Sequence, residues 1–186
     1  MEDRTRRIVE TAIDLAERDG YEAVRLRDVA SRAKVALGTV YRRFSSKQDI
    51  LVAGLEVEME RLARHIQNEP ITGSSPIERL VNAFTFMTHA LVAKPNLARA
   101  LLRAVASGVP ENTQRVAQFH ATSTMFLTSV LFDLDLPEEE KALVAGLLQD
   151  IWFAKLVGWS GGLQDVEQVI TDMTQATHRL IPNEPG

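Results

Sequence analysis

Basic side chains are concentrated in one short window of the chain. Between residues 25 and 47 there are seven lysines and arginines and a single acid, Asp28. Guanidinium and ammonium groups donate hydrogen bonds to phosphate oxygens, and arginine also pairs with the edge of guanine. The chemistry that this window offers is the binding of a phosphate backbone. The seven are Arg25, Arg27, Arg32, Lys34, Arg42, Arg43 and Lys47.

The charge of the whole chain, −4, argues by itself against a polyanionic partner, but the charge is unevenly distributed. Residues 1–47 carry +3 and residues 48–186 carry −7. A basic surface on an acidic body binds phosphate locally while the body limits non-specific association. The alternative is that the basic residues form a solvated helix face without a partner.

A second pattern with chemical potential is Gly158-Trp159-Ser160-Gly161-Gly162, which matches the G-x-S-x-G motif of hydrolases. That motif activates its serine only on a strand-to-helix turn above a parallel sheet. The spacing before Ser160 is helical, so this segment is more simply a helix end followed by a turn. We predict no catalytic residue and no enzymatic activity, with a helical hydrolase using Ser160 as the alternative.

Metal and cofactor chemistry have little support in this sequence. There is no cysteine, and the four histidines, His89 and His120 among them, show no short metal-ligand spacing. We therefore expect neither a metal nor a cofactor. The N-terminus resembles no secretory signal, and no stretch approaches 18 uninterrupted apolar residues, so we expect a cytoplasmic protein without a membrane partner.

The elements that must position the basic window are helices. Apolar residues recur every three or four positions, and no long alternation of period two appears, which predicts an all-α fold. We expect a three-helix helix-turn-helix domain over residues 1–47 and a helical ligand-binding and dimerisation domain over residues 48–186. The predicted helices cover residues 4–18, 26–32, 37–43, 47–67, 77–93, 95–107, 113–132, 138–159 and 163–180.

Two short helices, 26–32 and 37–43, are joined by a tight turn, which is the pattern of a helix-turn-helix. The second helix must enter a major groove about 12 Å wide, so it must be slim and polar on its outer face. Val40 and Phe44 face inward, and Gly38 removes bulk where backbone would approach DNA. On spacing alone, a plain three-helix packing unit remains an alternative.

The runs Arg27-Asp28-Val29-Ala30, Gly38-Thr39-Val40-Tyr41 and Phe44-Ser45-Ser46-Lys47, with Leu51, resemble the DNA-binding domain of TetR-family regulators over about residues 8–55. The resemblance implies a dimeric transcriptional repressor that binds double-stranded DNA. It implies contacts from Thr39, Tyr41, Arg42 and Arg43, a phosphate contact from Lys47 and a base contact from Arg27. The full set of expected DNA-binding residues is Arg25, Arg27, Lys34, Ala36, Leu37, Gly38, Thr39, Tyr41, Arg42, Arg43 and Lys47.

Three residues depart from the family pattern. Arg25 and Ala36 stand where a helix-capping Ser or Thr is usual, and a missing cap costs about 1 kcal/mol. Lys34 stands where the turn usually has glycine, and a left-handed conformation costs another residue about 1 kcal/mol. We expect these departures to lower local stability, while Arg25 and Lys34 add phosphate contacts.

Helix 138–159 carries more apolar surface than one inward face needs, and an apolar surplus on a soluble chain marks a partner site. In TetR-like proteins the last two helices pack against those of a second copy. The alternative is a central helix buried on all sides within one subunit. The expected dimer residues are Leu143, Leu147, Ile151, Val166, Ile170 and Met173.

The middle helices are expected to enclose a small molecule, although any single aromatic side chain in them is more often part of a core than of a ligand pocket. Residues 33–44, 47–55 and 150–159 also resemble the actinobacterial repressors of cholesterol and steroid catabolism. That resemblance implies an apolar effector, a steroid, a lipid or an acyl-CoA, that releases the homodimer from a palindromic operator. The alternative is an architectural DNA-binding protein without a ligand. The expected pocket residues are Phe84, Met87, Thr88, Leu91, Leu102, Val105, Phe119, Phe126 and Trp152.

Overall fold

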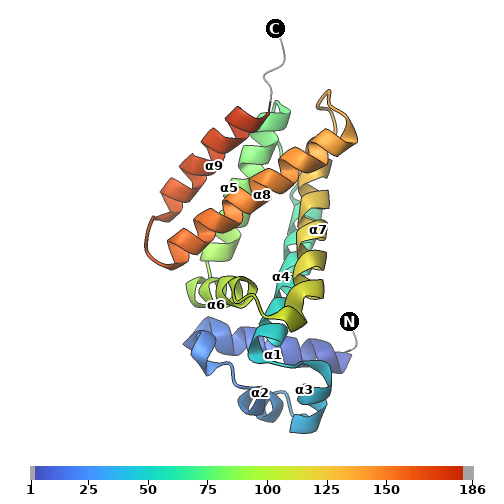
Figure 1. The fold of residues 1–186 in the computed structure, drawn as a ribbon, viewed down its shortest axis with the longest axis vertical. Helices are drawn as coiled ribbons and strands as arrows, with labels where there is room; N and C mark the ends of the chain where they lie inside the picture. Colours follow the sequence, from blue (N-terminus) through green and yellow to red (C-terminus); the bar gives the residue numbers. More distant parts are fainter. Residues whose placement is uncertain (1–2, 182–186) are drawn as a thin grey trace. The chain divides into compact units, whose positions relative to one another are not determined.

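The computed structural model describes residues 3–181, and every regular element in that range is helical (Figure 1). The predicted all-α fold is confirmed. The elements are α1 Asp3–Asp19, η1 Tyr21–Ala23, α2 Leu26–Arg32, α3 Leu37–Arg43, α4 Lys47–Asn68, α5 Pro76–Val92, α6 Pro95–Ala106, η2 Pro110–Asn112, α7 Thr113–Val130, α8 Glu138–Ser160 and α9 Val166–Leu180.

Capping side chains decide where several helices begin. At α5 the Ser75 side chain accepts a hydrogen bond from the Glu78 backbone N–H at 3.2 Å. The Glu78 carboxylate in turn accepts from the Ser74 backbone N–H at 2.7 Å and from the Ser74 hydroxyl. These bonds favour the charged carboxylate and lower the pKa of Glu78. The result is a reciprocal cap of the kind that satisfies the free N–H groups of a first turn.

The predicted start of the last helix at residue 163 is wrong. Asp165 is the N-cap of α9, and its carboxylate accepts from the Gln168 N–H at 2.8 Å, so the helix begins at Val166. Leu163 lies outside the helix and is 83 % exposed. The prediction from apolar spacing began the helix too early because Leu163 matches the helical period although its side chain is not buried.

The chain divides into two compact units. The first unit consists of residues up to 64 together with 94–119, and the second consists of 65–93 together with the residues from 120 onward. The functional boundary predicted at residue 47 was based on the DNA-reading residues and stays a prediction. The first compact unit contains α6 and the first turns of α7 in addition to the N-terminal helices.

The core of the first unit is shared by α1, α2, α3, α4 and α6. Ile8, Ile13 and Phe44 are among its fully buried side chains. Helix α4 approaches α1 closely at Gly54, where an added Cβ would lie 3.3 Å from Ile13 Cγ1. Helix α6 completes this core with Leu97, Ala100, Leu101 and Ala104.

In the second unit, α9 packs against both α5 and α8 (Figure 1). The Lys155 ammonium on α8 lies 2.5 Å from the Asp172 carboxylate on α9. The Trp152 indole N–H donates to the Thr88 hydroxyl at 2.9 Å, which ties α8 to α5. Met173 is 1 % exposed and belongs to this core. Its assignment to a dimer surface was therefore wrong, because it offers no area to a partner.

Candidate nucleic-acid interface

Helices α2 and α3 have the bounds that the sequence predicted, and a tight turn joins them. The Val35 N–H donates to the Ala30 carbonyl at 3.0 Å across this turn. Lys34 has φ of 54°, in the left-handed region that favours glycine. Val29, Val40 and Phe44 are buried on the inner side. The outer side of α3 is therefore held in place by a small apolar core.

The expected absence of side-chain caps is confirmed at two helix starts. Arg25 and Ala36 occupy the N-cap positions of α2 and α3, and neither makes a side-chain cap bond. No side chain at either N-cap position therefore competes with another acceptor for the first N–H groups, although the Thr39 N–H already donates to the Ala36 carbonyl at 2.8 Å. Phosphate oxygens are acceptors that helix N-termini bind readily.

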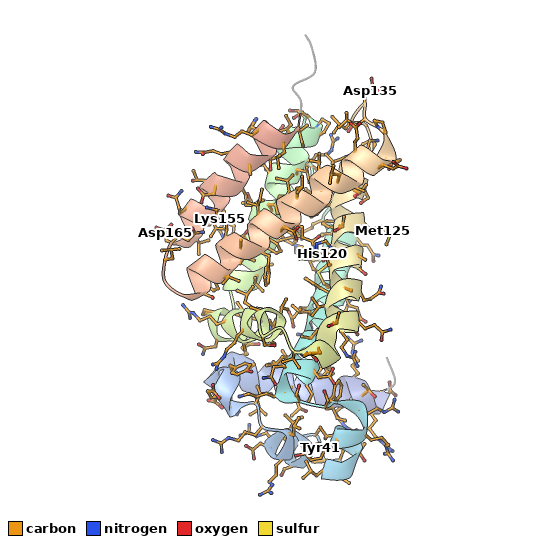
Figure 2. All side chains as sticks on the ribbon, viewed as in Figure 1. Tyr41, His120, Met125, Asp135, Lys155 and Asp165 are labelled. Atoms are coloured by element: carbon orange, nitrogen blue, oxygen red, sulfur yellow. The ribbon has the colours of Figure 1, made fainter. Side chains whose placement is uncertain are left out.

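Most of the residues expected to meet DNA lie on the surface of the first unit. Tyr41 is 58 % exposed and projects from α3 (Figure 2). Around Gly38 there is open space, with no atom within 4 Å of an added Cβ. The exposed members of the set are Arg25, Arg27, Lys34, Ala36, Gly38, Tyr41, Arg42 and Arg43.

Thr39 and Leu37 are only partly exposed. The Leu37 side chain packs against the core of the first unit. It anchors the start of α3, so its expected contact with DNA has less support than those of its exposed neighbours.

Lys47 has partners that the sequence did not reveal. Its ammonium lies 2.9 Å from the Glu22 carboxylate and 3.9 Å from the centre of the Tyr21 ring. Arg103 approaches the same two residues, at 2.9 Å and 4.1 Å. The hydrogen bond from Lys47 is the main cause that lowers the pKa of Glu22, which keeps this carboxylate charged. An ammonium has three N–H donors, so Lys47 can hold Glu22 and still donate to a phosphate.

A capping arrangement joins α3 to α4. The Asp49 N–H donates to the Ser46 hydroxyl at 3.1 Å, as expected for a capping box. The Asp49 carboxylate accepts from the Ser45 N–H at 2.9 Å, one residue earlier than in the usual arrangement. This corner fixes the direction in which α4 leaves the recognition helix.

The expected pocket residues are distributed over both units. In the second unit, Phe84, Met87 and Thr88 are buried, and the Phe84 and Trp152 ring centres are 6.0 Å apart. Leu91 and Phe126 of the same unit are partly exposed. Leu102, Val105 and Phe119 belong to the first unit, where Val105 and Phe119 pack against its core. Val105 and Phe119 therefore have a packing role, the alternative that the sequence left open for the aromatic side chains.

An apolar groove of about 920 Å³ lies between α7 and α8 in the second unit. Met125, Phe132, Leu143 and Leu147 line it and are between 43 and 71 % exposed. Met125 points away from α7 in Figure 2, and His120 Nε2 lies 3.1 Å from Asp150 Oδ1 at the edge of the groove. Of the expected dimer residues, Leu143 and Leu147 line the groove, whereas Ile151, Val166 and Ile170 are partly exposed elsewhere on α8 and α9.

Ser160 has none of the surroundings that a catalytic serine needs. It is the last residue of α8, and its hydroxyl donates to the Val157 carbonyl at 2.8 Å. Residues 3–181 contain no strand, so the motif does not lie on a strand-to-helix turn. Nor do those residues contain a cluster of three or more potential metal ligands.

Comparison with known proteins gives matches along most of the chain. The family model for bacterial regulatory proteins of the tetR family matches residues 8–53, and that for the tetracyclin repressor-like C-terminal domain matches residues 73–180. The HTH-type transcriptional repressor KstR of Rhodococcus jostii is 35 % identical over 157 residues, which are 84 % of this chain and 73 % of that protein.

Solved structures share this fold, among them one from Rhodococcus and one from Bacillus subtilis. A TetR transcriptional regulator from Rhodococcus sp. RHA1 superimposes with a TM-score of 0.87 at 24 % identity, covering 97 % of each chain. The regulator FadR of Bacillus subtilis, in complex with stearoyl-CoA, has a TM-score of 0.67 at 17 % identity, covering 95 % of this chain and 97 % of its own.

The resemblance inferred from residues 8–55 is thereby confirmed and extends to the C-terminal helices. The matched families are transcriptional regulators and not enzymes, which agrees with the prediction for Ser160. This chain belongs to the TetR family of bacterial regulatory proteins and resembles its KstR-type repressors.

Proposed function

We propose that this protein is a dimeric repressor that holds a palindromic operator and leaves it when an apolar effector binds its helical C-terminal part. The observation that carries the DNA-reading half is the exposed outer face of α3, with Tyr41 and Arg42 supported by buried Val40 and Phe44. Arg42 on this face offers the planar fork that pairs with guanine.

The dimer is supported by the apolar surface on α7 and α8. A helix-turn-helix protein binds two half-sites about 34–36 Å apart, which requires two copies. The groove side chains Met125, Phe132, Leu143 and Leu147 are hydrophobic and exposed, and Gly146 in its floor leaves room for close approach. We therefore assign this surface to a second copy of the chain.

Helix α8 is also long and apolar enough to cross a membrane by length and composition, and 22 % of its most apolar window is buried. It carries Asp150 and Lys155 in its second half, and Lys155 pairs with Asp172. Ionised groups are expensive at the centre of a bilayer. An interface with a second copy explains the exposed apolar surface of α8 and does not place charged groups in a bilayer. We therefore expect the protein in the cytoplasm.

The proposed effector class is supported by the resemblance to steroid-catabolism repressors and by apolar side chains of the second unit. Phe84, Met87 and Trp152 supply apolar and aromatic surface suited to a steroid or an acyl chain. The structural neighbour FadR carries stearoyl-CoA, which supports an acyl-CoA as one candidate. An effector releases DNA only to the extent that it binds the released state more tightly than the DNA-bound state.

The test is a mobility-shift assay on the DNA upstream of the protein's own gene, with and without a panel of steroids and acyl-CoA thioesters. We expect binding by the wild type, much weaker binding by Arg42→Ala, and release by one compound class. Release by none of the compounds, with DNA binding intact, would favour a DNA-binding protein of another effector class or without an effector. Equal binding of every duplex tested would reject the proposal that the protein recognises a specific operator sequence.

A further inference from the structure

Arg115, on the first turn of α7, contacts two residues at the junction of α3 and α4 and a third farther along α4. Its Nε donates to Asp49 Oδ1 at 2.9 Å, and its Nη1 donates to Glu56 Oε1 at 3.3 Å. Its guanidinium carbon lies 5.6 Å from the centre of the Phe44 ring. All four residues belong to the first unit, although Arg115 lies 66 residues beyond Asp49 in the sequence.

Phe44 and Asp49 are the residues that end the recognition helix and begin the next one. Phe44 is the C-cap of α3, is 1 % exposed, and donates its N–H to the Val40 carbonyl at 2.9 Å. Asp49 is 8 % exposed and accepts from Ser45 through its other carboxylate oxygen. A buried carboxylate needs its hydrogen bonds and a compensating charge, and Arg115 supplies both.

We propose that Arg115 is a positioning residue for DNA recognition, because it holds the exit of the recognition helix in place from α7. It acts through Phe44 and Asp49 and does not itself touch DNA. The proposal rests on the DNA-reading role of α3. It adds a direct link from α7 to the end of α3, so a shift of the first turn of α7 moves the recognition helix.

The chemistry of this link requires arginine. A guanidinium has a planar fork that bonds two carboxylates at once and also stacks against an aromatic ring. An ammonium at the same place keeps the charge beside Asp49 but loses the fork and the stacking. Arg115→Lys therefore separates the presence of a positive charge from the positioning that the fork provides.

The experiment compares wild type, Arg115→Ala, Arg115→Lys and Arg64→Ala. Arg64→Ala is the matched control, because it removes the same charge from the first unit while the Arg64 guanidinium bonds a carbonyl of its own helix, that of Glu60. The probes are an operator duplex selected by the wild type from random-sequence DNA and a scrambled duplex of equal length. This choice makes the test independent of the upstream site and of any effector.

We expect Arg115→Ala to weaken operator binding about tenfold, because the recognition helix that is no longer held in place must be ordered when it binds DNA. Binding of the scrambled duplex should stay within about twofold, since the phosphate contacts are unchanged. Arg115→Lys should give an intermediate ratio with a thermal unfolding midpoint near that of the wild type, and Arg64→Ala should leave the ratio unchanged.

Equal losses on both duplexes, or a lower unfolding midpoint with an unchanged ratio of affinities, would overturn the proposal and leave Arg115 a purely structural role. If Arg115→Ala does not fold, the ratio of operator affinity to scrambled-duplex affinity measured for Arg115→Lys decides between a positioning role and a purely structural role. Failure of the wild type to select any sequence would instead count against the proposed function.

Discussion

Lys34 combines a strained backbone with a charge on the DNA-binding side. Its φ of 54° is one that glycine adopts freely, and another residue there costs about 1 kcal/mol. The TetR pattern has glycine in this turn, so the lysine exchanges local stability for a cation beside α3. The conformation was expected from the family pattern, and the angle confirms it.

The replacement Lys34→Gly should therefore have opposite effects on folding and on DNA binding. We expect the free energy of unfolding to rise by up to about 1 kcal/mol, since relief of strain exceeds the added entropy of the unfolded chain. Affinity for any duplex should fall, because a phosphate contact is lost. Chemical denaturation and fluorescence anisotropy measure the two, and Lys34→Asn is a control that tolerates the same φ. A loss of stability would contradict the argument.

We expect the ion pair between Glu22 and Lys47 to limit how far Lys47 neutralises a DNA phosphate. Glu22→Gln removes the competing carboxylate, so we expect tighter DNA binding and a salt dependence steeper by up to about 1 per subunit. Lys47→Ala should change both quantities in the opposite direction. Titrations at several salt concentrations test this. Unchanged slopes in both variants would show that Lys47 serves only to hold Glu22 and Tyr21 together.

At the scale of elements, the contact between α8 and α9 depends on an ion pair with a definite pH response. Lys155 and Gln168 donate hydrogen bonds to Asp172, with Lys155 the larger cause, and together they lower the pKa of Asp172 (Figure 2 labels Lys155). A carboxyl group with a lowered pKa in the folded state stabilises the fold above its unfolded pKa. That contribution disappears as the pH falls through the folded pKa.

The free energies of unfolding of the wild type and of Asp172→Asn should accordingly differ most at neutral pH and become equal in acid. We expect the variant to unfold at a lower denaturant concentration at pH 7, with the difference shrinking below about pH 4, the ordinary carboxyl range. Urea unfolding across this range measures it, and Asp135→Asn, at an exposed position in the turn before α8, is the control. A difference that persists unchanged in strong acid would exclude the ion pair as its cause.

Local signals in the sequence were sufficient to predict most of the helices. The bounds of α2 and α3 follow from a short apolar period interrupted by the turn around Lys34. The outer face of α3 follows from the same period, since Val40 and Phe44 determine which side is inner. The start of α9 was misplaced because the Asp165 cap, and not the apolar Leu163, determines where the helix begins.

Pairings between distant segments could not be predicted in this way. Arg115 meets Asp49, and Lys47 meets Glu22, only because the first unit brings separate helices together. In the sequence, Met173 is compatible with an apolar stripe that faces either outward or inward. In the structure α9 packs with this side chain buried. Periodicity identifies a face of a helix but not the neighbour that the face contacts.

At the scale of the whole molecule, operator binding should depend on the apolar groove between α7 and α8. We expect Leu147→Glu to shift the protein from dimer to monomer and to reduce operator affinity at least tenfold, because one copy holds only one half-site. Ala90→Glu, which adds the same charge at an exposed position of α5, should leave both unchanged. Light scattering after size-exclusion chromatography measures the mass. A dimer that survives Leu147→Glu would place the subunit contact elsewhere.

The make-up of the first unit has a consequence for evolution and for engineering. Its core needs Leu97, Ala100 and Leu101, which the chain supplies only after it has passed through α5. A DNA reader cut out at residue 64 would expose this apolar side of α1 and α4 to water. Exchange of operator specificity between relatives by transplanting the N-terminal helices would therefore fail unless α6 and the start of α7 were transplanted with them. The DNA-reading part thus depends on a core that is discontinuous in the sequence, and exchange of its helices requires that α1 and α4 still fit α6.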